Sequence, residues 1–329
     1  MDGTGGPLLC FPNLNSSCKR LLRPHSDAAV LYTLLALVSL LTVKLNLLVI
    51  ISISHFRQLR TPTNTLLLSL AVSDMLVGLL VMPIEGLRYV ETCWLLGWLM
   101  CTLTPYVSYC LLSVSVGHMV LISVDRYVAI CYPLLYSSRI TLNRVKFLIS
   151  LCWACSMIYN GCILMGHLGR EDSFGSCHGE CVVVVGHAAG TVDLFATFVG
   201  PCAIMVVLYV RVFVVAVSQA RVIRLQTAAI SFTAATTAKK SERKAARTLG
   251  IVIAVFLMCF CPYYYPALKG EDTSNTLSYA AVLSWLILTN SCVNPLIYAL
   301  FYPWFRKAIK LILTLKILRV PESQDTKIL

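Results

Sequence analysis

The stretch that decides the fold lies near the amino terminus, where residues 28–53 read AAVLYTLLALVSLLTVKLNLLVIISI. Lys44 is the single charged residue in it. A helix needs about 20 predominantly apolar residues to cross the hydrocarbon core of a bilayer. The stretch is therefore long enough for one membrane-spanning helix, with the Lys44 side chain reaching toward the interface or the lipid.

Six further stretches of this kind follow. The seven predicted spans are Ala28–Ile53, Thr65–Val90, Cys101–Ile130, Val145–Leu164, Gly190–Val217, Ala245–Ala267 and Thr276–Phe301. Charged residues make up 13% of the 329-residue chain, against about a quarter in soluble proteins. We therefore predict an all-α membrane protein, a seven-transmembrane-helix bundle over 28–301. It follows an extracellular segment (1–27) and precedes a short amphipathic cytoplasmic helix (302–318) and a cytoplasmic tail (319–329).

Basic residues mark one side of the predicted membrane. They fall in alternate connections and after the last span, at Arg57, Arg60, Arg139, Arg144, Lys146, Arg211, Arg221, Arg224, Lys239, Lys240, Arg243, Lys244, Arg247, Arg306, Lys307, Lys310, Lys316 and Arg319. Positive residues gather on the cytoplasmic side, so we predict a multi-pass plasma-membrane protein, surrounded by lipid, with its amino terminus outside. This topology accounts for the net charge of +12. No basic stripe with an aromatic platform indicates nucleic acid as a partner.

Six cysteines fall on the predicted outer side, where disulfides persist. They are Cys10, Cys18, Cys93, Cys101, Cys177 and Cys181. A metal site at Cys177 and Cys181 is not favoured, because no second pair with ligand spacing accompanies them. Asn15-Ser16-Ser17 is a glycosylation sequon in the segment predicted to be extracellular. We therefore predict a glycan on Asn15.

Seven spans would also suit a transporter or a light-driven retinal pump. A retinal protein needs a lysine in the last span for its Schiff base, and residues 276–301 contain none. Inverted repeats with paired broken helices, which indicate a transporter, are also missing from the sequence. A receptor remains, and we predict no enzymatic activity.

One marker in each span supports the receptor interpretation. The third span ends in Asp125-Arg126-Tyr127, and the seventh ends in Asn294-Pro295-Leu296-Ile297-Tyr298. The other spans contribute Asn46, Leu70-Ala71-Val72-Ser73-Asp74, Trp153, Pro201 and Pro262. Taken together, the markers resemble the pattern of rhodopsin-like G protein-coupled receptors.

Within that class, the chain resembles the trace amine-associated receptors, which are mostly olfactory receptors for volatile amines. The run Phe301-Tyr302-Pro303-Trp304-Phe305-Arg306-Lys307-Ala308 is similar to that family's fingerprint, as is Glu91-Thr92-Cys93-Trp94. The similarity covers residues 9–316. It implies a small cationic amine as ligand, a heterotrimeric stimulatory (olfactory-type) G protein as partner, and a location in olfactory sensory neurons.

The resemblance also implies the parts that couple the ligand to the G protein. Arg126 is the expected latch, paired in the inactive state with Asp125 and, across the bundle, with Glu242. Tyr209 and Tyr298 are expected to help hold the open state. Tyr127, Asn294 and Pro295 complete the two motifs.

A sodium ion is the only cofactor that the resemblance suggests. Asp74, Ser115, Asn290 and Asn294 resemble the sodium pocket of the class, in which the cation favours the inactive packing. The alternative for these four residues is a purely structural hydrogen-bond network.

Two disulfides are implied by the resemblance. One joins Cys101 to Cys181, and the other joins Cys177 to an amino-terminal cysteine. We expect Cys18 rather than Cys10 in this second bond, because Cys18 is closer to the first span.

The expected amine site departs from the plan of the biogenic amine receptors. Those receptors hold the ammonium with an aspartate eighteen residues before the Arg of Asp-Arg-Tyr, five helical turns away on the same face. That position is Ser108 here, which offers a hydrogen bond and no counter-charge. Asp193, eight residues before Pro201 and about 12 Å toward the outside, is the counter-ion implied by the resemblance to fish-type members. An internal pair with a basic residue, or a place at the interface, is the alternative for Asp193.

Aromatic residues complete the expected ligand site. The faces of Tyr109, Tyr263 and Tyr264 could attract an ammonium with about 0.5–2 kcal/mol, or the rings could serve helix packing alone. Phe260 stands where the class has a tryptophan switch, below the expected ammonium. We expect it to act on the conformational transition more than on binding.

Glu85 is the last candidate in the ligand site. It lies eleven residues after Asp74, close to three helical turns, so both should face the interior unless Pro83 kinks the helix. One interpretation is a second cation site, which would suit a diamine or a polyamine. The other is an interfacial acid that faces solvent or Arg88.

The sequence thus predicts an amine receptor that raises cyclic AMP. A non-signalling scaffold or decoy receptor of the same fold, and a receptor for a non-amine ligand, are the alternatives. The intact Asp125-Arg126-Tyr127 and Asn294-Pro295 motifs favour signalling, whereas Ser108 and Phe260 leave room for the alternatives.

Overall fold

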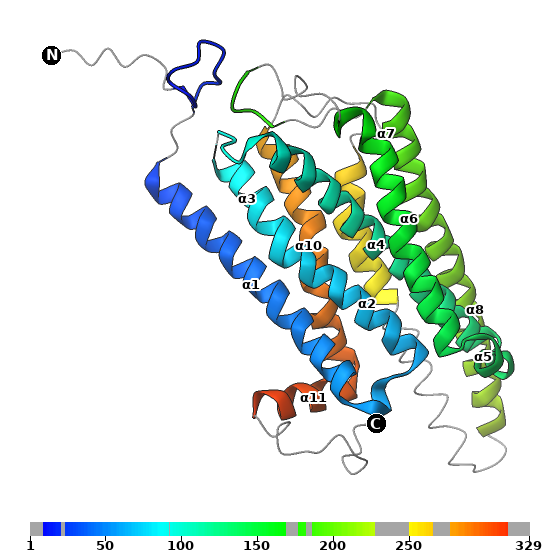
Figure 1. Cartoon of the computed structure of the whole chain (residues 1–329). Helices are drawn as coiled ribbons and strands as arrows, with labels where there is room; N and C mark the ends of the chain where they lie inside the picture. Colours follow the sequence, from blue (N-terminus) through cyan, green and yellow to red (C-terminus); the bar gives the residue numbers. More distant parts are fainter. Residues whose placement is uncertain are drawn as a thin grey trace.

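The computed structural model describes residues 9–20, 24–91, 93–168, 177–181, 186–227, 250–265 and 277–314, and its long helices form one bundle (Figure 1). Six described segments are long and apolar enough to cross a membrane: His25–His55, Pro62–Val90, Gly97–Cys131, Leu142–Leu164, Ala188–Ser218 and Val282–Ala299. A further apolar helix, Gly250–Tyr265, is the described part of the span predicted at 245–267. The prediction of an all-α, seven-helix bundle is confirmed.

The helices run beyond several of the predicted spans. In chain order they are α1 (His25–His55), η1 (Arg57–Leu59), α2 (Pro62–Leu76), η2 (Val77–Val81), α3 (Met82–Val90), α4 (Gly97–Cys131), α5 (Pro133–Arg139), α6 (Leu142–Leu168), α7 (His187–Asp193), η4 (Leu194–Val199), α8 (Gly200–Thr227), α10 (Leu277–Phe301) and α11 (Pro303–Leu313). The Gly250–Tyr265 helix lies between α8 and α10 in the chain. Apolar composition sets the length that lies in lipid, whereas backbone hydrogen bonds can continue past it into the interface.

The second and fifth spans each contain a π-helical turn just before a proline. The turn η2 precedes Pro83, and the turn η4 precedes Pro201. Proline lacks an N–H and crowds the carbonyl four residues earlier, which favours a wider turn at that point. A π turn changes the rotation between the two halves of a helix. The π turn η2 lies between Asp74 and Glu85, and both of these side chains are nevertheless buried, as the helical count from Asp74 predicts.

The helix α4 lies at the centre of the packing. It contacts α2, α6 and α8, while α10 packs against α1 and α2. Phe256 of the Gly250–Tyr265 helix and Val114 of α4 are fully buried. The helix α11 lies across the ends of α1 and α10 (Figure 1) and buries Phe305 and Ala308.

Three disulfides gather at one end of the bundle, which we call the disulfide end. They join Cys10 to Cys93, Cys18 to Cys177 and Cys101 to Cys181. The bond between Cys10 and Cys93 was not predicted from the sequence. We call the opposite end, where α5 and α11 lie (Figure 1), the Arg126 end.

The segment 9–20 is tied to the segment 177–181 by main-chain bonds as well as by a disulfide. The Cys18 N–H donates to the His178 carbonyl at 2.8 Å, and the His178 N–H donates to the Ser16 carbonyl at 2.8 Å. Gly179 has a φ of 105° and faces Cys10, so a side chain at this position would be both strained and crowded. Asn15 is exposed in the segment 9–20.

Candidate functional site

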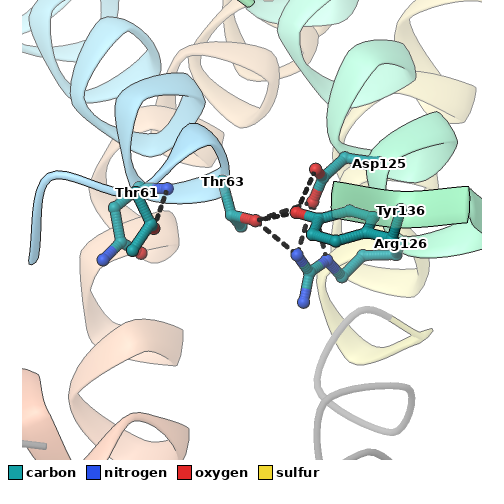
Figure 2. Close-up of polar contacts among 6 residues, drawn as sticks. Thr61, Thr63, Asp125, Arg126 and Tyr136 are labelled. Carbon is teal, nitrogen blue, oxygen red and sulfur yellow. Dashed lines mark hydrogen bonds and ion pairs between the residues drawn. The ribbon is translucent and has the colours of Figure 1, made fainter. Parts of the chain in front are cut away.

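Asp125 and Arg126 form the centre of a polar cluster at the Arg126 end (Figure 2). The Arg126 Nε donates to the Asp125 Oδ2 at 2.9 Å. The Thr63 hydroxyl donates to the same oxygen at 2.9 Å, and the Tyr136 hydroxyl donates to the Asp125 Oδ1 at 2.9 Å. Arg126 also donates to the Thr63 oxygen. The Asp125 carboxylate is therefore held from three helices, α4, α2 and α5.

Neither Thr63 nor Tyr136 was predicted from the sequence as a partner of Asp125. Thr63 is in place because the Thr61 side chain caps the start of α2, accepting from the Asn64 N–H at 3.2 Å (Figure 2). Burial raises the pKa of the Tyr136 phenol, which therefore stays protonated and can donate to Asp125. Glu242, the expected partner of Arg126 across the bundle, lies outside the described residues.

Three further members of the expected activation set lie elsewhere. Tyr127 packs edge-on against Tyr132, with 5.8 Å between the ring centroids, and does not join the cluster around Asp125. Tyr209 lies so close to Gly250 that any side chain there would collide with its phenol. Tyr298 is buried in α10, and its hydroxyl has no hydrogen-bond partner among the described residues. Pro295 lies within α10.

Asp74 lies fully buried in the middle of the bundle. The Asn294 side-chain amide donates to its Oδ2 at 2.9 Å, and the Ser115 hydroxyl donates to its Oδ1 at 3.4 Å. The structure thus brings together three of the four residues expected at a sodium site. Asn290 is also buried, and the side-chain oxygens of Asn290 and Asn294 both lack a hydrogen-bond partner in the described structure.

A cavity of about 190 Å³ opens among α3, α4, α10 and the Gly250–Tyr265 helix. Its lining consists of Val81, Glu85, Arg88, Tyr89, Pro105, Ser108, Tyr109, Leu112, Tyr263, Ser284, Ile287 and Leu288. Four residues expected at the ligand site are among them: Ser108, Glu85, Tyr109 and Tyr263. An apolar cavity of about 150 Å³ can hold benzene, so this one has room for a small organic molecule.

Glu85 does not present a free carboxylate to the cavity. The Arg88 Nη1 donates to its Oε2 at 3.4 Å, one turn along α3. The structure therefore contains the pairing with Arg88 that was the alternative to a second cation site. Ser108 differs, because its buried hydroxyl has no hydrogen-bond partner among the described residues.

Asp193 lies outside the lining of this cavity, at the last residue of α7 before the turn η4. It is half-buried and accepts from the Tyr159 hydroxyl at 3.2 Å. No basic partner of Asp193 is seen among the described side chains, which leaves a place at the interface as the alternative to a counter-ion role. Tyr109 and Tyr263 lie on the cavity wall instead.

Tyr264 belongs to the Asp193 side of the site. Its ring stacks on Phe198, with centroids 4.4 Å apart, and its hydroxyl lies 3.3 Å from that of Thr197. Thr197 in turn donates to the main-chain carbonyl of Asp193 at 2.7 Å. Tyr264 thus packs against the π turn that follows Asp193.

Comparison with known proteins fits this arrangement. Residues 45–298 match the family of seven-transmembrane receptors of the rhodopsin type. The chain is 39% identical over 323 residues to trace amine-associated receptor 13c of Danio rerio, an alignment that covers 96% of this chain and 94% of the relative. It is 42% identical over 332 residues to trace amine-associated receptor 7e of Mus musculus, covering 96% and 90%. The chain belongs to the trace amine-associated receptors.

Membership of the family has three direct consequences. The chain is a receptor and not an enzyme. It is a multi-pass membrane protein. Its partners are a small-molecule ligand and a heterotrimeric G protein.

Phe260 lies below the cavity of this receptor and outside its lining. It is buried, and it stacks on Phe256 one turn away, with ring centroids 4.1 Å apart and planes at 25°. Phe260 was expected among the ligand contacts, but it does not line the cavity. The stack places Phe260 in the packed core of the bundle, where the sequence predicts that it acts on the conformational transition.

We predict that Phe260→Trp changes the maximal response of the receptor more than its ligand potency. The larger ring must displace Phe256 in a closely packed core, at a cost of about 1–3 kcal/mol, while the ligand cavity above keeps its lining. Dose–response curves measure both quantities. A shift in half-maximal concentration with unchanged basal and maximal signals would place Phe260 in the binding site instead.

Proposed function

We propose that this chain is an olfactory amine receptor whose ligand enters from outside the cell and pairs its ammonium with Asp193. The receptor then activates a stimulatory, olfactory-type G protein and raises cyclic AMP. The observation that carries this proposal is the half-buried Asp193 carboxylate, which has a phenol as partner and no cation within ion-pair distance in the described part of the chain.

A carboxylate inside a membrane protein needs a compensating charge. Insertion of such a residue at a helix centre costs about 2.5–3.5 kcal/mol, and burial of an unpaired charge is costly in general. Glu85 and Asp125 have arginine partners, whereas Asp193 has a single hydroxyl. A ligand ammonium would supply the missing charge.

The surroundings of Asp193 suit the rest of a small amine. Tyr109 and Tyr263 line the cavity, and Tyr264 packs against the π turn that follows Asp193. A cation over the face of such a ring gains about 0.5–2 kcal/mol. The unpartnered Ser108 hydroxyl can accept or donate one hydrogen bond to the ligand.

We assign the disulfide end to the outside of the cell and the Arg126 end to the cytoplasm. The three disulfides and the exposed Asn15 sequon suit an extracellular, oxidising and glycosylating environment. The cluster of Asp125, Arg126, Thr63 and Tyr136 then lies where a G protein binds and acts as the latch of the inactive state. The family resemblance supports a location in olfactory sensory neurons.

A sodium ion at Asp74 is part of the proposal. The buried carboxylate and the unpartnered oxygens of Asn290 and Asn294 form an all-oxygen set, the donor type that hard cations prefer. These residues, with Ser115, would hold the ion and stabilise the inactive packing.

A non-signalling scaffold or decoy receptor is the second candidate function. Phe260 and Ser108, which replace a tryptophan and an aspartate of the usual plan, favour it. The complete hydrogen bonding around Asp125 and Arg126 favours a working latch and therefore signalling. A non-amine ligand would leave Asp193 without a counter-charge.

We predict that Asp193→Asn abolishes amine-evoked cyclic AMP while the receptor still reaches the cell surface. The amide keeps the shape and the bond to Tyr159 but loses the charge. Asp27→Asn, the same substitution in the first turn of α1, is the matched control and should respond as wild type. An amine dose–response curve that Asp193→Asn leaves in place would refute the assignment.

We predict that Thr63→Ala raises ligand-independent signalling. The change removes a donor to Asp125 and an acceptor for Arg126, so the arginine is released more easily. Each such bond to a charged group is worth about 1.5–3 kcal/mol, so basal cyclic AMP should rise several-fold. Thr65→Ala is the control, because Thr65 bonds to the Thr61 carbonyl of its own helix. Equal basal signals in the two variants would show that Thr63 does not restrain Arg126.

A further inference from the structure

Glu85 and Arg88 place an ion pair in the wall of the ligand cavity. They lie one turn apart on α3, and both line the cavity. The Glu85 side chain is 10% exposed and the Arg88 side chain is 27% exposed. Arg88 is thus the more accessible partner of the pair.

The pairing with Arg88 weakens the attraction of Glu85 for any other cation. The Arg88 charge lies 3.4 Å from the Glu85 carboxylate and largely cancels its attraction for a second cation. A ligand ammonium would have to displace Arg88, which would leave the guanidinium without its counter-charge in the wall. The loss of that counter-charge disfavours a second ammonium at Glu85.

We propose that Arg88 is a specificity-determining residue that closes the Glu85 subsite to cations, so that the receptor takes an amine with one positive charge and a neutral, hydrogen-bonding far end. This inference rests on the proposed function, in which Asp193 holds the single ammonium. The neutral group is an alcohol, ether or carbonyl. A diamine is disfavoured, because its second ammonium meets the Arg88 guanidinium.

The cavity wall offers hydrogen-bonding groups to a neutral oxygen of the ligand. One bond to Glu85 occupies one of the five N–H donors of Arg88, and the Ser108 hydroxyl is buried without a partner. Tyr89 and Ser284 bond to each other at 2.9 Å on the same wall. A neutral oxygen can accept from Arg88 or Ser108 without repulsion from Glu85, whereas a second carboxylate would be repelled by it.

The experiment compares length-matched amino alcohols and diamines, on propane to hexane chains, with purified full-length receptor in nanodiscs and with transfected cells. Thermal stabilisation measures binding and cyclic AMP measures signalling. Wild type should prefer each amino alcohol to its matched diamine by at least tenfold, about 1.4 kcal/mol. Arg88→Gln should raise the affinity for diamines at least tenfold by freeing Glu85. Arg88→Lys, which keeps the charge, should behave as wild type.

The double variant Glu85→Gln with Arg88→Gln should lose the gain in diamine affinity, because no carboxylate is left to free. Diamine binding that is unchanged in Arg88→Gln would overturn the proposal. So would a wild-type preference for diamines that Glu85→Gln removes, which would make Glu85 a second cation site. This last comparison decides the question even if Arg88→Gln does not fold.

Asp193→Asn, measured in parallel, separates the two proposals. If it leaves all amine binding in place, the proposed function fails, and a Glu85-dependent gain of diamine binding in Arg88→Gln still supports the role of Arg88. If Asp193→Asn abolishes amine binding while Arg88→Gln changes nothing, the proposed function stands and the role of Arg88 is rejected.

Discussion

The arrangement depends on one constraint: an acid inside the bilayer needs a positive charge beside it. Beyond Asp27 in the first turn of α1, the described spans contain four acids: Asp74, Glu85, Asp125 and Asp193. Two of them have arginine partners, Arg88 and Arg126. The other two, Asp74 and Asp193, have amide and hydroxyl partners in the described structure. We propose that each of these two acids binds a cation. Asp74 would bind a sodium ion, and Asp193 would bind the ammonium of the ligand.

The same constraint separates the buried carboxylates of the bundle into two kinds. A carboxylate that is paired within the protein, such as Asp125 held by Arg126, Thr63 and Tyr136, already has its counter-charge, and we propose that this cluster is the latch of the inactive state. A carboxylate without an internal cation is available for binding. Glu85 lines the cavity but belongs to the first kind, and we therefore propose that it does not by itself make a second cation site.

The sequence predicted the spans, the motifs and the family, because apolar length and fixed local patterns carry that information. It could not predict the partners that depend on three-dimensional packing. Thr63 and Tyr136 reach Asp125 from other helices, and the disulfide between Cys10 and Cys93 joins segments far apart in the chain. The π turns before Pro83 and Pro201 were not predicted either. Glu85 is buried and lines the cavity as the helical count predicted, but the count could not decide between a free carboxylate and the observed pair with Arg88.

The central claim is that Asp193 is the counter-ion of the ligand. An experimental structure of the receptor with a bound amine and its G protein tests it most directly. The account predicts that the ammonium nitrogen lies within ion-pair distance, about 4 Å, of an Asp193 carboxylate oxygen. An ammonium that instead contacts Glu85 or Ser108, with Asp193 still bonded to Tyr159 alone, would contradict it.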